Sequence, residues 1–557
     1  MRWRDRRRRS GGPAGPGASP ATRTLFVLLA IENLLINYTS TAMNVALSAL
    51  VRDLHTTLTG VQAAISLYAL VAAAFLITGS KAGARHGHRR TFLLGGVVFA
   101  LGSLITAFAP GLPSVLLGWS LLQGLGVALM LPALLAMLTG AFTGAARTKA
   151  LSTLAMTSGV GATAGPVVGG LITTYLDWRV SFLLGAGVTL TVAWLLRHTA
   201  GARPSPVATG QRFDVLGVVL STTGLALLVV ASLLVGRYGL LEARQDFTVF
   251  GITLLERGGV SPVPVLSAVG LVVLAVFAGW ERHLVTSGGD PLVRVSVLRD
   301  RTVRTGTSAQ MMQILVPSGA LFLVPVFLQT TLGFDALRCG VVLLPTALGL
   351  LLAAGPTARR VGRGRMTHRA AAMGAFALMA AGCGAVALLF GPDAQGVAAV
   401  GLALAPGILL LGLGRGMATT ITDLVQSAPP PDEVSDVTGL SRTAGYLGSS
   451  FGVALAGALV TAGLLYAFEA GVRDSGVLTA AQKETATRTL EQQVQITAAS
   501  DDALRARLAS RGVTGAAADE LVRINARARE QALTVSALGM AVLAVAGWLQ
   551  ARRIPAG

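Results

Sequence analysis

Long apolar segments, separated by shorter polar connections, run along almost the whole chain. Fourteen of them are about long enough, at 1.5 Å per helical residue, to cross a hydrocarbon layer roughly 30 Å thick. Helices are expected, because hydrocarbon offers no partner for an open backbone amide. The expected crossings are Leu25–Leu50, Val61–Gly79, Thr91–Ala109, Ser114–Leu138, Leu151–Leu176, Phe182–Leu196, Val215–Val235, Val263–Trp280, Gly306–Leu328, Cys339–Ala354, Ala370–Phe390, Val397–Thr420, Val437–Phe468 and Leu533–Leu549.

This pattern predicts an all-α integral membrane protein built from several units. The units are a disordered basic tail (1–23), a six-helix bundle (24–200), two additional membrane helices (213–282), the first five helices of a C-terminal bundle (305–468), a polar insertion (469–530) and a last membrane helix (532–551). Within the insertion, 500–512 has a plausible N-cap and predicts a short helix on the outer face. The insertion is either a lid over an outer vestibule or a tolerated surface segment.

Composition agrees with a membrane protein. Of 557 residues, 53% are hydrophobic and 13% charged, and 68 glycines suit closely packed membrane helices. The net charge of +19 would favour nucleic-acid binding only if the basic residues gathered on one folded surface, but they are spread over connections. The two cysteines, Cys339 and Cys383, lie far apart on apolar segments and form no metal or disulfide pattern.

The distribution of cations predicts the orientation. If the tail is cytosolic, about 28 of the 45 Lys and Arg fall on the inner side and about six on short outer connections. Both termini are therefore expected to be cytoplasmic, in a multi-pass protein of a bacterial plasma membrane, with the basic residues contacting anionic lipid. We expect no nucleic-acid partner and a monomer.

Glu32 is the first candidate for chemistry, because it lies roughly 10 Å inside the first crossing. An acid inside the membrane costs at least about 2.5 kcal/mol on insertion scales and usually faces a cavity or a partner. Thr39 shares its face, and Asn33 and Asn37 belong to an adjacent polar stripe. Glu32 is therefore our proton-coupling candidate; the alternative is a structural hydrogen bond between helices.

Further polar and soft side chains are candidates for lining a substrate cavity. Arg415 could contact an anionic substrate, balance Glu32, or extend its charged end toward the inner surface. An Asp423–Arg442 pair could close the inner side in one state, or be a static contact. The remaining cavity candidates are Tyr68, Trp119, Gln123, Met130, Gln310 and Gln313, which could equally be packing residues.

Enzyme functions find no support in the sequence. There is no Gly-x-x-x-x-Gly-Lys-Ser/Thr loop for ATP hydrolysis, and the histidines show no metal spacing. We expect no cofactor, with a proton gradient as the energy source.

Several motifs resemble those of the major facilitator superfamily, in particular its fourteen-helix drug:proton antiporter family. "SGVGATAGPVVGG" followed by "DWRVSF" is similar to the antiporter motif and the element after it, and "KAGARHGHRR" (81–90) to the basic inner loop. "LLQGLGVALMLPA", "TAMNVALSAL" and "SRTAGYLGSSFGVALAG" also resemble family segments. The residues that carry the antiporter motif are Gly159, Gly161, Gly165, Pro166, Gly169 and Gly170.

The chain also departs from the family pattern. Ala84 stands where the loop motif usually has Asp, Ser120 where the fourth helix has Arg, and Thr39 where the first helix is often acidic. The joint loss of an acid and a base fits removal of a pair as a unit, which leaves Glu32 as a relocated carboxylate. The loop resemblance makes Arg85, Gly87 and Arg89 candidates for a cytoplasmic gate, together with Asp423 and Arg442.

The resemblance implies a fold and a function. The fold would be two six-helix bundles plus two extra helices, and the function proton-coupled export of lipophilic drugs or antibiotics by alternating access, with substrate and proton competing for one cavity face. An apolar cavity favours the neutral form of a carboxyl, so Glu32 could load a proton outside and release it inside. The alternatives are export or uniport of an endogenous metabolite, peptide or lipid, and a non-transporting membrane sensor.

Overall fold

The computed structural model confirms the all-α membrane fold. It describes residues 20–142, 144–199, 214–243, 245–249, 252–389, 397–428, 434–480, 482–484, 486, 501–510 and 513–555. Within these ranges fourteen helices are long and apolar enough to cross a membrane, as predicted. Most of the predicted tail lies outside the described residues, but residues 20–23 already belong to the first helix.

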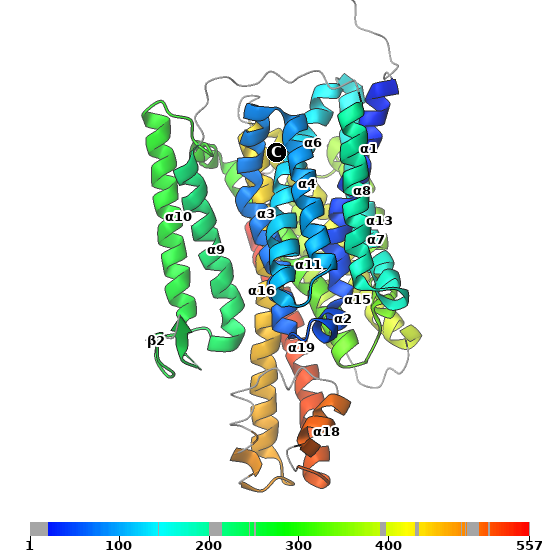
Figure 1. Ribbon diagram of the computed structural model, residues 1–557, viewed down its shortest axis with the longest axis vertical. Coiled ribbons are helices and arrows are strands. Elements are labelled where there is room, and N and C mark those ends of the chain that lie inside the picture. The colour runs from blue at the N-terminus through cyan, green and yellow to red at the C-terminus, as the bar shows by residue number, and fades with distance from the viewer. Residues whose placement is uncertain are drawn as a thin grey trace, which may run out of the picture.

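The N-terminal half, residues 20–198, is a bundle that contains six of the membrane-crossing helices. Figure 1 shows its arrangement. A long helical extension, described below, projects from one end of the bundle, and we call this end distal. The opposite end, where the first helix begins at Pro20, is called proximal. The elements of this half are α1 (Pro20–Ala42), η1 (Met43–Val45), α2 (Leu47–Asp53), α3 (Leu58–His86), α4 (His88–Ala107), α5 (Leu112–Val115), η2 (Leu116–Gln123), α6 (Gly124–Ala141), α7 (Gly144–Tyr175) and α8 (Trp178–His198).

Local sequence signals set the helix ends. The Thr57 side chain accepts a hydrogen bond from Gly60 N and begins α3, and the Asp177 side chain accepts one from Arg179 N and begins α8. Gly87 lies between α3 and α4 with a φ of 92°, a conformation that glycine adopts without strain. The inner-loop motif therefore forms a tight turn between two long helices.

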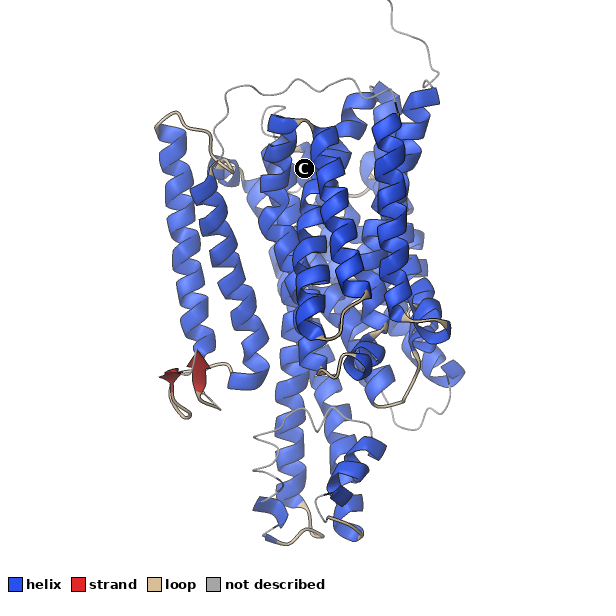
Figure 2. Ribbon diagram, viewed as in Figure 1, coloured by secondary structure: helices blue, strands red, loops and turns tan. Residues whose placement is uncertain are grey.

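Two further helices lie beside the bundle, at the left in Figure 1. They are α9 (Val215–Tyr238) and α10 (Pro262–Thr286), and α9 packs against α3 and α16. Their distal connection contains an antiparallel hairpin, β1 (Phe247–Val249) and β2 (Ile252–Leu255), which the sequence analysis did not predict (Figure 2).

The C-terminal half contains the last six crossings. Its elements are α11 (Arg301–Thr330), α12 (Ala336–Val342), α13 (Leu344–Gly362), α14 (His368–Leu389), α15 (Val397–Ser427), α16 (Val434–Asp474), α18 (Asp501–Ser510) and α19 (Ala516–Ala551), with the short η3 (Val295–Arg299) before α11. The helix predicted within 500–512 is therefore present as α18.

The polar insertion is partly an extension of two membrane helices. α16 continues to Asp474 and α19 begins at Ala516, and both project beyond the bundle (Figure 1). Apolar side chains at helical spacing hold them together, which explains why helix continues into a polar segment. These side chains are Leu464, Leu465, Ala467, Phe468, Val472, Leu478, Leu521, Ile524, Ala528 and Ala532.

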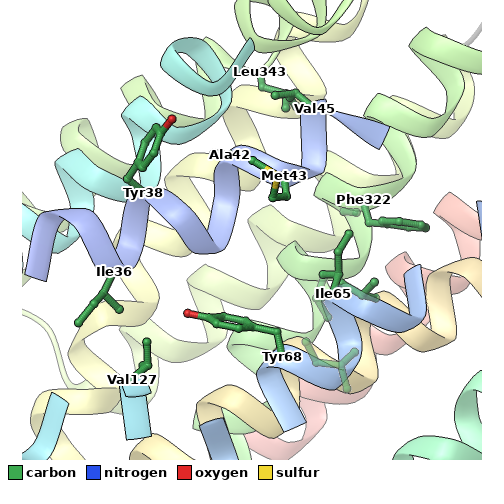
Figure 3. Close-up of a cluster of buried hydrophobic side chains, with 14 of the residues drawn as sticks. Ile36, Tyr38, Ala42, Met43, Val45, Ile65, Tyr68, Val127, Phe322 and Leu343 are labelled. Atoms are coloured by element: carbon green, nitrogen blue, oxygen red, sulfur yellow. The ribbon is translucent and has the colours of Figure 1, made fainter. Parts of the chain in front are cut away.

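The two halves meet along close contacts of small and polar residues. Toward the distal end, Gln329 of α11 donates to Val45 O (3.0 Å) and accepts from Ser48 N (2.9 Å). Along α3 and α16, Gln62 donates to Val453 O (3.1 Å) and Ala454 O (3.0 Å). One hydrophobic core runs through both halves; Figure 3 shows Tyr68 of α3 near Ile36 of α1, with Phe322 of α11 in the same cluster.

Candidate functional site

Glu32 lies inside the N-terminal half, between α1 and α8. Its side chain is fully buried, and Thr189 Oγ1 donates a 2.8 Å hydrogen bond to Oε1. Oε2 is buried and has no hydrogen-bond partner among the described residues. The Thr189 hydroxyl therefore occupies Oε1 and leaves Oε2 without a donor from the described residues. The carboxyl group therefore faces α8 within its own half.

The asparagine stripe lies on another face of α1. Asn33 is buried, and its Nδ2 lies within hydrogen-bond distance of Leu154 O (2.9 Å), Thr157 Oγ1 (3.0 Å) and Ser158 Oγ (2.7 Å) of α7, so it joins the two helices. Asn37 is half-buried and donates to Asn33 O (2.7 Å). Glu32 and this stripe thus point in different directions, so the structure does not place them on one shared face.

Thr39 and Ser120, which replace the family's usual charges, are satisfied by backbone carbonyls. Thr39 donates to Leu35 O and Ile36 O of its own helix, both at 3.1 Å. Ser120 donates to Ala64 O of α3 at 2.8 Å. The short side chains fill the space without a buried charge, as expected if an acid and a base are removed together.

Four predicted cavity residues are packed within the N-terminal half in this conformation. Gln123 donates to Ser103 Oγ of α4 at 2.6 Å, and Met130 lies against Gly95 of the same helix. Trp119 packs between Tyr68 (ring centroids 6.1 Å apart) and Phe182 (5.9 Å). All four candidates are at most 3% exposed, so none lines an open surface here. Trp119, Ser120 and Gln123 belong to η2, a π-helical segment of a kind that often marks functional positions.

The other candidates gather in the C-terminal half. Gln310 and Gln313 lie one turn apart on α11 and hydrogen-bond to each other, and Thr422 of α15 donates to Gln310 Oε1 at 2.8 Å. Arg415 is half-buried in the middle of α15. Thr422 was not predicted from the sequence, although it follows Arg415 by seven residues and so shares its helical face.

The residues predicted to form a cytoplasmic gate do not form one contact network in this conformation. Arg89 donates to the carbonyls of Leu196, Arg197 and Thr199 and thereby caps the end of α8. Arg85 is exposed. Asp423 is exposed and Arg442 half-buried, and the described residues contain no ion pair between them, so this conformation lacks the predicted contact.

The antiporter-motif glycines form contacts on two sides of α7. Cβ atoms built at Gly161, Gly165 and Gly169 would collide with α1, at Leu34, Thr41 and Ala42. Gly170 faces Ala336 O of α12, and Pro166 O faces Gly340. A Cβ at Gly159 would lie 3.4 Å from Leu350 of α13. Gly161, Gly165 and Gly169 thus pack α7 against α1 within the N-terminal half. Gly159, Pro166 and Gly170 pack α7 against the C-terminal half.

Sequence reasoning missed a pair of carboxyl groups, Glu281 and Asp214, at the proximal end of the extra helices. Glu281 is fully buried and accepts from Val293 N at 3.0 Å, and Asp214 accepts from Gly217 N (2.8 Å) and Trp280 Nε1 (2.9 Å). A Cβ at Gly217 would contact both carboxyls, so they lie close together. The sequence signal for this site was Glu281, an acid near the end of the otherwise apolar helix α10.

These features define a multi-pass membrane transporter of two helical halves. A family model described as "Major Facilitator Superfamily" matches residues 29–453, and the chain belongs to this superfamily. It is thus a transporter rather than an enzyme.

Curated relatives and solved structures resemble the chain over most of its length. It is 30% identical to "Probable actinorhodin transporter" of Streptomyces coelicolor, over 80% of this chain and 75% of the relative. It is also 30% identical to "Cephamycin export protein CmcT" of Amycolatopsis lactamdurans, over 78% and 84%. The inward-facing, unoccupied crystal structure of a bacterial homolog of the lysosomal transporter Spinster has a TM-score of 0.61 and 14% identity, covering 97% of this chain and 98% of that one.

Proposed function

We propose that this protein exports a lipophilic small molecule in exchange for protons. The named relatives that are transporters or exporters of antibiotics support an exporter of the drug type. The observation that carries proton coupling is Glu32, which is the only acidic residue between Arg23 and Asp53. It is buried, and its Oε2 has no hydrogen-bond partner among the described residues. An isolated acid in a membrane helix usually marks an ion pathway.

Coupling would act through α1. Glu32 and Asn33 are adjacent on one helix but face different neighbours, α8 and α7. Protonation of Oε2 would change how Glu32 packs against Thr189, and a small shift of α1 would move the asparagine stripe. Proton and substrate would then act on different sides of α1. They would compete because each would favour a different position of this helix.

Alternating access would open the distal contacts. The halves meet there through Gln329 and through the Gly170–Ala336 approach, both of which involve short contacts that separate without unfolding a helix. Rocking of one half against the other would open the distal end and close the proximal end. If both termini are cytoplasmic, the described conformation is closed toward the outside.

Flux in proteoliposomes tests this function. Protein inserted with its proximal end outward is supplied in separate experiments with anionic fluorescein and with cationic ethidium, and the lumen is made acidic. We expect dye to accumulate in the lumen and to leave when a protonophore collapses the gradient, with protein-free vesicles as the control. Equal entry with and without the gradient would indicate uniport, and no flux of any dye would favour a sensor.

A further inference from the structure

Two arginines lie within membrane-crossing helices without acidic partners. Arg415 of α15 and Arg442 of α16 are half-buried, and within the described ranges neither forms an ion pair or a hydrogen bond. The Nε atom of Arg442 is buried and unpartnered. A cation in a membrane interior is costly and is normally compensated by a partner, so each of these groups calls for an anion that the described chain does not supply.

Helical spacing places Arg442 on the part of the α16 surface between α11 and α3. Gly445, three residues further along, faces Gln310 Nε2 and Ile314 of α11, each 3.8 Å from a Cβ built there. Thr443, on the adjoining face, donates to Ala73 O of α3 at 3.3 Å. Since residues three and four apart share a helical face, Arg442 lies on the side that carries Gly445 and Tyr446.

Arg415 of α15 also faces α11. Its neighbour Gly414 packs on α14, where a Cβ would lie 2.7 Å from Ala375 O, and Gly416 packs on α13, 2.6 Å from Leu350 O. Thr422, two turns beyond Arg415, donates to Gln310 of α11. The face of α15 that carries Arg415 therefore looks toward α11, away from α13 and α14.

The two arginines lie at different depths. Gln310 contacts Thr422 of α15 and lies close to Gly445 of α16, which fixes the relative heights of the three helices. At 1.5 Å per residue, Arg415 lies roughly 10 Å further from the proximal end than Thr422, whereas Arg442 lies slightly nearer to that end than Gly445. Gln310 and Thr422 lie between the two cations.

None of the acids whose side chains the structure describes pairs with these arginines. Glu32 is hydrogen-bonded to Thr189 inside the other half, and Asp423 is exposed. Extension of the Arg415 side chain to a membrane surface is also excluded by length, because twelve residues, or about 18 Å of helix, separate it from the end of α15 at Ser427. Its charge must be met inside the bundle.

We propose that the transported molecule carries an anionic group, such as a carboxylate, sulfonate or phenolate, on an apolar body. Arg442 receives this group near the proximal end, and Arg415 holds it at mid-depth, with the amides of Gln310 and Gln313 and the Thr422 hydroxyl between them. This inference deepens the proposed function and rests on it for the direction of transport; anion binding itself is independent of transport.

Binding of a matched dye pair tests the proposal. Fluorescein is anionic and rhodamine 6G cationic on the same ring system, and both are titrated at one pH into the full chain in lipid nanodiscs, with fluorescence anisotropy as readout. We expect the native chain to prefer fluorescein. Arg415→Gln and Arg442→Gln should each weaken fluorescein binding about tenfold or more and leave rhodamine 6G unchanged, since a hydrogen bond to a charged group is lost.

Two further variants separate charge from packing. Arg415→Lys keeps the charge and should retain part of the fluorescein affinity. Arg338→Gln removes an exposed distal arginine, paired with Asp335 at 3.1 Å, and should change neither dye. A native preference for rhodamine 6G, or equal loss of both dyes in folded Arg415→Gln, would overturn the proposal.

Vesicle flux of the same dyes keeps the two proposals distinct. Arginine-dependent fluorescein binding without gradient-driven flux would support the anion site and refute the proposed exporter. Gradient-driven flux that is insensitive to both arginine substitutions would support the exporter and refute the anion site.

Discussion

Substitution of Gly170 by alanine should shift the balance between conformations. Gly170 lies in α7, where it faces α12 of the other half, and a Cβ atom there would lie 2.5 Å from Ala336 O and 2.9 Å from Leu337 Cα. Real Cβ atoms essentially never approach other atoms closer than 3.0 Å, and these are backbone atoms, which cannot turn aside. The halves must therefore separate locally to admit the methyl group.

The size of the effect follows from overpacking. An extra methylene in a packed contact typically costs about 1–3 kcal/mol. In the proposed alternating-access cycle this contact exists only when the distal end is closed. The whole cost would then fall on that conformation, and the ratio of closed to open molecules should fall by about five-fold to more than a hundred-fold. Gly161→Ala is the comparison within one half, where α7 meets α1 and the strain should affect both conformations.

Spin-label distances across the contact measure this shift. Labels are placed at Tyr175 of α7 and Val341 of α12, both exposed, in a chain whose two buried cysteines are replaced by serine. Gly170→Ala should move population from the short to the long distance. Gly187→Ala, where a Cβ would meet nothing within 4 Å, should match the parent. An unchanged distribution in Gly170→Ala would refute the idea that this approach is specific to the closed form.

Two further predictions concern stability. Trp178→Phe removes the hydrogen bond from Trp178 Nε1 to Asp53 Oδ2 (3.1 Å) and should lower the free energy of unfolding, measured by denaturant titration, by about 1 kcal/mol. Trp194 is exposed, and an equal loss in Trp194→Phe would contradict the assignment of this energy to the hydrogen bond. Asn525→Leu replaces a fully buried amide that has no hydrogen-bond partner among the described residues. The change removes a desolvation cost of about 1–3 kcal/mol, so amide hydrogen exchange in residues 516–531 should slow by the corresponding factor. Faster exchange would contradict this prediction.

The fold could be predicted largely from hydrophobic length. A bilayer demands segments of fixed length with satisfied backbones, so fourteen apolar runs already implied fourteen helices. The ends were less predictable, because helix continues wherever a neighbour covers it. The stretch around Leu521 is polar overall, yet it joins α19 since its apolar side chains pack on α16. The β-hairpin after α9 lies in a polar connection where no bilayer constrains the backbone.

The site could be predicted by residue type but not by direction. Glu32 and Asn33 are adjacent in sequence, and only the packed bundle shows that one faces Thr189 of α8 and the other α7. Gln123 is a plausible cavity residue by composition, but its partner Ser103 comes from another helix. Arg442 was paired with Asp423 by charge alone, but it lies near α11 and has no ion-pair partner among the described residues.

Dye accumulation by Glu32→Gln in vesicles with an acidic lumen tests the central claim most directly. Glutamine keeps the shape and the acceptor for Thr189 but cannot exchange a proton, so the variant should let dye equilibrate without concentrating it, while the native chain accumulates dye in the lumen. Accumulation by Glu32→Gln equal to that of the native chain would contradict the proposal that this carboxyl couples proton movement to export.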